Sequence, residues 1–329
     1  MAKDNARKEK QSPETPTQTH TLSQQYGGIH TGAWLARLSP PAGVFLIYFP
    51  HLFGVIHGAI QQRSPASSVA ETCAVMLGGS FFFSNAIHIW NDLVDAPIDR
   101  LVARTSQRPI ARGAVSPPAA FIFAVTQAVG AAAVLICFLP ARSAWYAAPN
   151  LVTTIYYPWS KRHTHFAQVV LGVWLAWGVI MGSAAMGATP YVVDFTSGEY
   201  EINKSTICLY ISCVLWTVIY DTIYAHQDIK DDTKIGVKSL AVLLRDKTKF
   251  ALYFLVGVMA LLLNASSRYA EMSFLFSIFA VLGSMLSLGA MITMVDLADP
   301  ASCLWWFRYG FWLVGTLISL GLVLEYTFA

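Results

Sequence analysis

Charged residues are scarce in this chain, and their scarcity excludes most soluble folds. Only 12% of the 329 residues are Asp, Glu, Lys or Arg, whereas 55% are hydrophobic and the mean hydropathy is +0.49. Soluble domains carry about 25% charged residues. The composition therefore indicates an integral, multi-pass membrane protein that is embedded in the lipid bilayer. We attribute the net charge of +3 to membrane topology and expect no nucleic-acid partner.

Paired cysteines and targeting signals are lacking as well. The five cysteines lie in or beside apolar segments without a Cys-x-x-Cys spacing, which favours apolar packing over disulfide or metal chemistry. Residues 1–33 are polar, so we expect a disordered N-terminal tail. Acidic side chains at Asp4, Glu9 and Glu14 argue against a mitochondrial transit peptide, and no cleavable signal peptide is visible. We therefore expect an endomembrane such as the ER rather than the mitochondrial inner membrane.

Long apolar segments, in contrast, are abundant. Nine of them are near the length of about 17–25 residues that crosses a bilayer. They fall roughly at 41–60, 69–90, 116–139, 142–158, 166–187, 206–225, 250–266, 272–295 and 305–326. The sequence therefore predicts an all-α membrane domain over residues 34–329, with about nine transmembrane helices around a central cavity. Only a turn at Pro140 separates the third and fourth segments, which leaves the count open by one.

The basic residues indicate how these helices are oriented. If the N-terminus is cytoplasmic, all but four of the 22 Lys and Arg residues fall in the tail or at the cytoplasmic ends of the spans. The exceptions are Arg63, Arg142, Lys204 and Arg268. This asymmetry supports both nine spans and a cytoplasmic N-terminus.

Carboxylates gather in two short clusters that directly follow the second and sixth apolar segments, which puts both in caps on the cytoplasmic side. The clusters are Asp92, Asp95 and Asp99, and then Asp221, Asp228, Asp231 and Asp232. Spacings of three and four, and offsets of seven and eleven from Asp221, place most of these side chains on one helical face. Asp231 lies off that face and is expected to be merely solvated. Pro97 predicts that the first helix stops near Asp95, leaving Asp99 on a following turn.

Acids near membrane depth indicate a bound cation, because a charge at the bilayer centre costs roughly 2.5–3.5 kcal/mol. Oxygen ligands without thiolates favour Mg²⁺ over zinc, and Mg²⁺ takes one or two carboxylates plus substrate phosphates. We therefore interpret the clusters as a site for two Mg²⁺ and a diphosphate. Two Mg²⁺ cannot neutralise so many negative charges, so basic side chains must lie close. The candidates on the same side are Arg37, Arg100, Arg104, Arg108, Lys161 and Arg162.

Two other interpretations stay open at this point. A single acidic cluster is more often a solvated loop than a site, although two such clusters on one side weaken that interpretation. A cation-coupled membrane transporter also places acids within its spans. Its acids are expected near the midplane, whereas these lie toward one face.

The clusters lie in motifs that resemble those of the UbiA-type polyprenyltransferases. Asn91 begins N-D-x-x-D-x-x-x-D, and Tyr220 begins Y-D-x-x-Y-A-x-x-D-x-x-x-D. Shorter matches are Arg108-Pro109-Ile110 with Gly113, Tyr157-Pro158 with Lys161-Arg162, Gln168-x-x-Leu171-Gly172, and Lys234-x-Gly236-x-Lys238-Ser239. The resemblance covers nearly all of the chain after residue 33. It is closest to the branch that prenylates 4-hydroxybenzoate in ubiquinone synthesis and to its fungal meroterpenoid farnesyltransferase relatives.

One segment departs from the 4-hydroxybenzoate branch. That branch usually carries R-L-D-K-P-I-G before the first span, whereas this chain has Arg37-Leu38-Ser39-Pro40-Pro41-Ala42-Gly43. The departure favours an aromatic polyketide or pyrone as acceptor, with farnesyl diphosphate as donor, as in the meroterpenoid enzymes. Two alternatives stay open, namely polyprenylation of 4-hydroxybenzoate and prenylation of homogentisate-like acceptors.

The resemblance also implies an aromatic prenyltransferase with defined site residues. The implied Mg²⁺ ligands are Asn91, Asp92, Asp95, Asp99, Asp228 and Asp232. The groups implied to bind the prenyl diphosphate or the aromatic acceptor are Arg37, Asn91, Asp99, Arg100, Arg108, Lys161, Arg162 and Tyr224. Catalysis is implied for Asp92, Asp95, Asp228 and Asp232 through the metal ions. We interpret Asp221 as the base that takes the phenolic proton.

Overall fold

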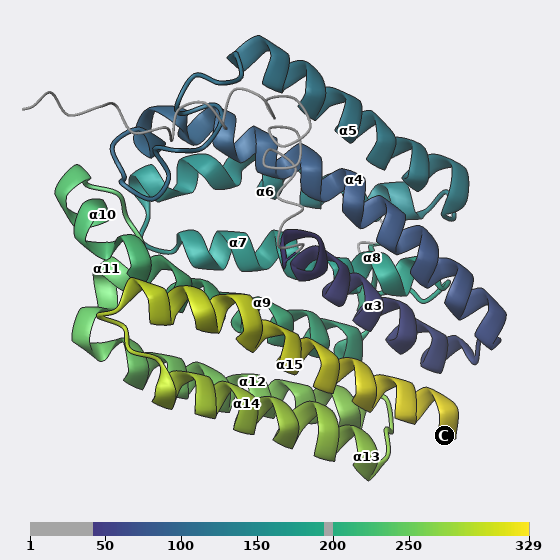
Figure 1. Ribbon diagram of the computed structural model, residues 1–329. Coiled ribbons are helices and arrows are strands. Elements are labelled where there is room, and N and C mark those ends of the chain that lie inside the picture. The colour runs from purple at the N-terminus through teal and green to yellow at the C-terminus, as the bar shows by residue number, and fades with distance from the viewer. Residues whose placement is uncertain (1–41, 194–199, 329) are drawn as a thin grey trace, which may run out of the picture.

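The computed structural model describes residues 42–193 and 200–328, and long helices dominate it (Figure 1). The tail and Arg37 lie outside the described residues. The helices of the first half are α3 (Ala42–Gln62), α4 (Ala66–Asp99), α5 (Pro117–Phe138), α6 (Ser143–His163), α7 (Ala167–Ala176) and α8 (Gly178–Ala185). Those of the second half are α9 (Lys204–Ala225), α10 (Ile229–Ile235), α11 (Leu240–Leu244), α12 (Thr248–Tyr269), α13 (Phe274–Phe276), α14 (Gly283–Met294) and α15 (Pro300–Phe328).

Short elements join these helices. They are the 3₁₀ turns η2 (His226–Asp228) and η3 (Arg245–Lys247), the π-helical η4 (Ser277–Leu282), and the strands β1 (Tyr191–Val193) and β2 (Tyr200–Ile202). The two strands form an antiparallel pair in which Tyr191 lies opposite Ile202. The turn η2 has a consequence for the site, because it bends the chain between the two parts of the second acidic cluster.

Within the described residues, eight of the nine predicted spans are present as helical segments that are long and apolar enough to cross a bilayer. One of them combines α7 and α8 over Ala167–Ala185. The remaining segment, α6, is 21 residues long but less apolar, with Pro149 and Pro158 inside it and a partly polar buried face. Its crossing of the bilayer, like the cytoplasmic N-terminus, stays a prediction.

Helix α4 is longer than the sequence suggested. It continues to Asp99, so the expectation that Pro97 would stop it near Asp95 is wrong. Pro97 lies in the last turn, where its missing N–H removes one hydrogen bond, and the Arg100 amide still donates to the Ala96 carbonyl at 3.3 Å. All three acids of the first cluster therefore lie on one continuous helix.

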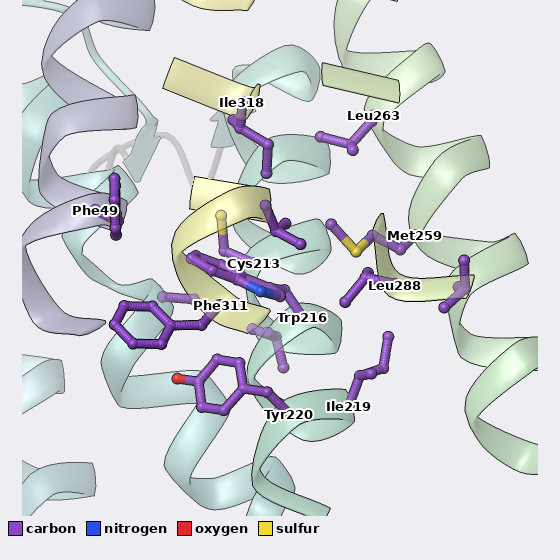
Figure 2. Close-up of a cluster of buried hydrophobic side chains, with 14 of the residues drawn as sticks. Phe49, Cys213, Trp216, Ile219, Tyr220, Met259, Leu263, Leu288, Phe311 and Ile318 are labelled. Carbon is purple, nitrogen blue, oxygen red and sulfur yellow. The ribbon is translucent and has the colours of Figure 1, made fainter. Parts of the chain in front are cut away.

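The largest buried cluster joins α3, α9, α12, α14 and α15, and Figure 2 shows its centre. Trp216, Tyr220 and Phe311 are among its largest fully buried side chains. The rings of Trp216 and Tyr220 meet edge-on, with centroids 5.7 Å apart. Because Tyr220 directly precedes Asp221, this packing holds the part of α9 that carries the inner acid of the second cluster.

Helices α3 and α8 touch through their backbones. A Cβ atom at Gly182 would lie 2.3 Å from the His51 carbonyl oxygen, and one at Gly54 would lie 2.2 Å from the Val179 carbonyl oxygen. Small residues allow such close approach of membrane helices. Gly178 and Gly182 therefore serve the packing of α8 against α3.

Substituting Gly182 with Ala should destabilise the protein, because backbone atoms would have to move to accommodate the methyl group. We expect a loss of about 1–3 kcal/mol, measured by thermal or denaturant unfolding in detergent. The matched control is Gly257→Ala in α12, where nothing lies within 4 Å of the new Cβ. Equal stability of the two variants would contradict the backbone contact.

Candidate active site

Six of the seven acids in the two clusters line one cavity of about 570 Å³. Its walls come from α3, α4, α6, α7, α9, η2, α10, α15, the loop that joins α4 to α5, and the segment between α10 and α11. The C-terminal ends of α4, α6 and α9 meet at the same end of the bundle (Figure 1). A cavity of this volume is in the range of small-molecule sites, and it combines charged side chains at one side with apolar side chains below.

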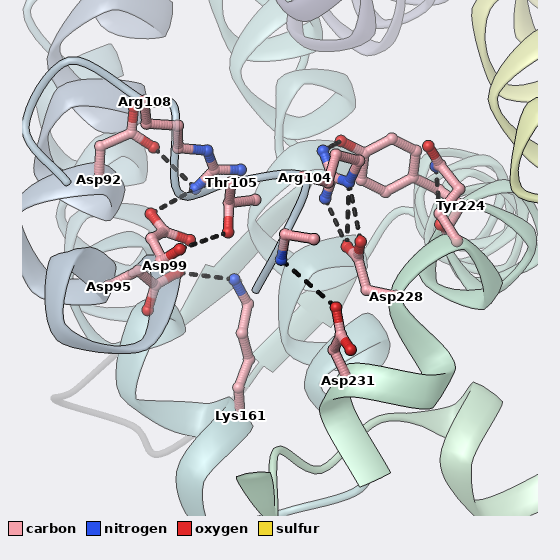
Figure 3. Close-up of polar contacts among 12 residues, drawn as sticks. Asp92, Asp95, Asp99, Arg104, Thr105, Arg108, Lys161, Tyr224, Asp228 and Asp231 are labelled. Atoms are coloured by element: carbon pink, nitrogen blue, oxygen red, sulfur yellow. Dashed lines mark hydrogen bonds and ion pairs between the residues drawn. The ribbon is translucent and has the colours of Figure 1, made fainter. Parts of the chain in front are cut away.

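The first cluster is buried and paired with basic side chains (Figure 3). Arg108 donates from Nη1 to Asp92 Oδ1 at 3.1 Å and to Asp99 Oδ2 at 2.8 Å. Lys161, at the end of α6, donates from Nζ to Asp95 Oδ2 at 2.9 Å. The predicted placement of the three acids on one face of α4 thus agrees with the structure, since all three line the cavity.

The second cluster reaches the cavity through a bend. Asp221 lies on α9, Asp228 ends the turn η2, and Asp232 lies on α10, yet all three line the cavity. Asp231 is not among the lining residues. Its Oδ2 accepts a hydrogen bond from the Ala103 amide at 3.3 Å, and it forms a longer ion pair with Lys234 at 3.8 Å. Asp231 therefore anchors the α4–α5 loop from outside, rather than being solvated only.

Arg104 binds the second cluster from the same loop that carries Arg108. Its Nε donates to Asp228 Oδ1 at 2.9 Å, its Nη2 to Asp228 Oδ2 at 2.5 Å, and its Nη1 to the Tyr224 hydroxyl at 2.9 Å. Its guanidinium also lies 5.0 Å from the centre of the Tyr224 ring. Two arginines four residues apart thus connect the loop to both clusters (Figure 3).

Electrostatics keep these arginines charged. Burial by itself lowers the pKa of Arg108, but the carboxylates of Asp92 and Asp99 outweigh burial and raise that pKa above its ordinary value. Burial likewise lowers the pKa of Arg104, and Tyr224 and Asp228 reverse the effect and raise it. The cavity therefore holds fixed positive charges beside its carboxylates.

Two oxygens in the first cluster still lack a hydrogen-bond partner. They are Asn91 Oδ1 and Asp95 Oδ1, both buried, and neither has a partner in the described part of the protein. Buried acceptors without donors fit a cation, and an all-oxygen set fits Mg²⁺. Within residues 42–193 and 200–328, no three His, Cys, Asp or Glu side chains form a complete metal site by themselves. A metal here would therefore need ligands from a substrate, as Mg²⁺ bound to a diphosphate does.

The other predicted residues divide into two groups. Tyr224 lines the cavity, together with the residues described above. Arg100 and Arg162 are not among the lining residues, because Arg100 Nε donates to the Ala111 carbonyl at 3.0 Å and Arg162 Nη2 donates to the Val94 carbonyl at 2.7 Å. That Arg100 and Arg162 bind substrate stays a prediction, and their contacts with backbone carbonyls away from the cavity do not favour it.

Three basic residues at the cavity were not selected as site residues from the sequence. Arg104 was considered only as a countercharge, and Lys238 and Arg308 also line the cavity. Lys238 lies in the matched segment Lys234-x-Gly236-x-Lys238-Ser239, which was the available signal. Arg308 lies at the start of the last span. No local pattern distinguished it from the basic residues that only set the orientation of the helices in the membrane.

Helical spans that surround a cavity with paired acidic clusters and arginines define a membrane enzyme for anionic, partly apolar substrates. The chain belongs to the UbiA prenyltransferase family, whose model matches residues 47–315. It is 38% identical over 260 residues to the prenyltransferase stbC of Stachybotrys bisbyi, covering 78% of this chain and 76% of that protein. It is 32% identical over 277 residues to the mitochondrial 4-hydroxybenzoate polyprenyltransferase of Schizosaccharomyces pombe, covering 84% of this chain and 74% of that protein.

The fold is shared with solved structures. A UbiA homologue from Archaeoglobus fulgidus bound to GPP and Mg²⁺ superposes with a TM-score of 0.61 at 16% sequence identity. The superposition covers 86% of this chain and 99% of that one. This likeness shows the fold, and the family match makes the chain an all-α integral membrane prenyltransferase.

Proposed function

We propose that this protein transfers a farnesyl group from farnesyl diphosphate to an aromatic polyketide or pyrone in meroterpenoid biosynthesis, in a reaction that depends on Mg²⁺. The observation that carries the proposal is the pair of acidic clusters, linked to arginines and a lysine, above an apolar cavity floor. The Mg²⁺ and GPP of the Archaeoglobus homologue support the donor class.

The acids and Asn91 provide the ligands for the metal. Asn91, Asp92, Asp95 and Asp99 from α4, with Asp228 and Asp232 opposite, would hold two Mg²⁺, which neutralise the diphosphate and stabilise it as a leaving group. The unpaired Asn91 Oδ1 and Asp95 Oδ1 support this assignment.

The basic side chains bind the diphosphate oxygens. Arg104, Arg108 and Lys161 lie between the clusters and would donate charge-assisted hydrogen bonds to the substrate. The C–O bond to the diphosphate then breaks, and both bonding electrons leave with the diphosphate. The remaining allylic carbocation is attacked by a ring carbon of the acceptor, which forms the new C–C bond.

Asp221 takes up the proton that the reaction releases. It lies at the cavity wall about two helical turns before Asp228, next to the buried Tyr220. In that position its carboxylate can accept the phenolic proton, which raises the electron density of the acceptor ring. After the new C–C bond forms, the proton on the substituted ring carbon moves to the phenolic oxygen, which restores aromaticity. The one proton that the reaction releases is therefore the proton held by Asp221.

Aromatic and aliphatic side chains protect the carbocation. Tyr157, Trp174 and Phe307 line the cavity, and Trp174 packs with its ring centroid 6.2 Å from that of Tyr157. Aromatic faces stabilise a cation, and the apolar wall keeps water from capturing it. Such a lining suits a prenyl chain and is not required for ion transport.

The second candidate is polyprenylation of 4-hydroxybenzoate, which the Schizosaccharomyces relative favours. The segment with Ser39 and Pro40, which departs from the motif of the 4-hydroxybenzoate branch, lies outside the described residues. The membrane also differs between the candidates: an endomembrane goes with the first, and the mitochondrial inner membrane with the second. The membership in a prenyltransferase family disfavours the cation-coupled transporter.

An acceptor screen tests the proposal. Membranes containing the protein, with Mg²⁺ and farnesyl diphosphate, should prenylate orsellinic-acid-type phenols or hydroxypyrones, as measured by product mass. Adding EDTA should remove the activity, because Mg²⁺ is needed to stabilise the leaving group, and excess Mg²⁺ should restore it. Product from 4-hydroxybenzoate alone, especially with longer diphosphates, would favour the second candidate instead.

A further inference from the structure

A short segment at the edge of the cavity connects the two acidic clusters, and its residues Val237, Lys238 and Ser239 line the cavity. This segment, Gly236–Leu240, is called the strap, and it follows α10, which carries Asp232. Helix α10 ends at Gly236, whose φ of +77° suits glycine. The amides of Gly236 and Val237 both donate to the Asp232 carbonyl, the latter at 3.0 Å. The strap therefore starts at the turn that holds Asp232.

The strap is bound to the residue that pairs with the first cluster. The Lys238 amide donates to the Lys161 carbonyl at 2.9 Å. The side chain of Lys161 in turn donates to Asp95 at 2.9 Å. A continuous connection thus runs from Asp232 through the strap and Lys161 to Asp95.

Gln168 holds the far end of the strap. It lies on the first turn of α7, is only 3% exposed, and accepts the Leu240 amide on Oε1 at 3.0 Å. Leu240 is buried as well, so without this acceptor its amide would lose its partner inside the protein. A second, longer contact joins the same elements, since His165 Nδ1 donates to the Ser239 carbonyl at 3.3 Å.

We propose that Gln168 is a positioning residue for the metal–diphosphate site. By holding the strap against α6 and α7, it sets the separation between Asp232 and the Lys161–Asp95 pair. That separation determines whether both clusters can engage one diphosphate at the same time. Gln168 acts through Lys161 and Asp232, and the inference rests on the proposed diphosphate-dependent function.

The test compares Gln168→Leu, which removes the acceptor, with Gln168→Glu, which keeps an oxygen at that position. Purified protein in detergent is titrated with inorganic pyrophosphate and Mg²⁺ by calorimetry, and KM is measured separately for farnesyl diphosphate and for the acceptor. Gln168→Leu should weaken pyrophosphate binding by about 10- to 100-fold, because the loss of a group that orients metal ligands commonly has an effect of this size. It should raise KM for the diphosphate alone, and Gln168→Glu should bind almost as well as the wild type.

Unchanged pyrophosphate affinity in folded Gln168→Leu, or an equal rise in both KM values, would overturn the inference. If Gln168→Leu does not fold, the same measurements are made on Gly236→Ala. An alanine at Gly236 strains the backbone at the start of the strap, because φ is +77° there, and it causes no clash, because nothing lies within 4 Å of the new Cβ. The same selective loss would then support the inference, and its absence would overturn it. Wild-type protein that binds no pyrophosphate would overturn the proposed function itself.

Discussion

Asp92→Asn should reduce product formation by about 10²–10³-fold while the protein still folds and inserts. The amide oxygen can still accept the hydrogen bond that Arg108 donates to Asp92, so local packing is kept. The negative charge that would attract Mg²⁺ is lost, however, and the diphosphate becomes a poorer leaving group. Product mass per amount of folded membrane protein measures the effect.

Asp231→Asn is the matched control for this substitution. Asp231 belongs to the second cluster in sequence, but it contacts the α4–α5 loop and is not among the cavity-lining residues. Its substitution should leave turnover near that of the wild type. Near-normal turnover in Asp92→Asn, or equal losses in both variants, would contradict the two-metal interpretation.

Asp221→Asn should separate ionisation of the donor from condensation with the acceptor. A positioned base typically contributes about 10²–10⁴-fold, so the prenylated product should fall by that factor while diphosphate binding is kept. The carbocation would still form, and water would capture part of it because the acceptor ring is less activated. The ratio of prenyl alcohol to prenylated acceptor should therefore rise, as mass spectrometry can measure.

Asp228→Asn gives the contrasting behaviour. Asp228 is held by Arg104 on the opposite wall, where the diphosphate would bind. Its substitution should reduce diphosphate binding and both products together. If Asp221→Asn behaves in the same way, Asp221 belongs to the metal site, and its assignment as the base is wrong.

Local spacing carried much of the information about the site. The positions of Asp92, Asp95 and Asp99 follow from helical geometry, which acts over a few residues, and all three line the cavity as expected. The same reasoning failed at Pro97, because a proline in the last turn costs one hydrogen bond and need not end the helix. It also gave an incomplete description of Asp231, whose partner Ala103 lies 128 residues away in the chain.

The choice among basic residues was not available from local patterns. Arg100, Arg104 and Arg108 are equally spaced along one loop, yet Arg100 contacts a carbonyl of that loop while the other two reach the carboxylates. Their selection depends on how the loop folds across the ends of α4 and α9. Lys161 and Arg162 are adjacent and point to different partners for the same reason.

Composition and short spacings were enough to indicate the membrane environment, the all-α class and the acidic side chains that line the cavity. These properties depend on composition and on spacings within one or two helical turns, which are visible along the chain. The pairing of each basic side chain with its carboxylate, the full set of cavity-lining side chains and the contact between Gln168 and the strap follow from the packing of the helices. Those contacts join residues far apart in sequence, such as Arg104 and Asp228 at a separation of 124 residues, and depend on how packed helices bring their ends together.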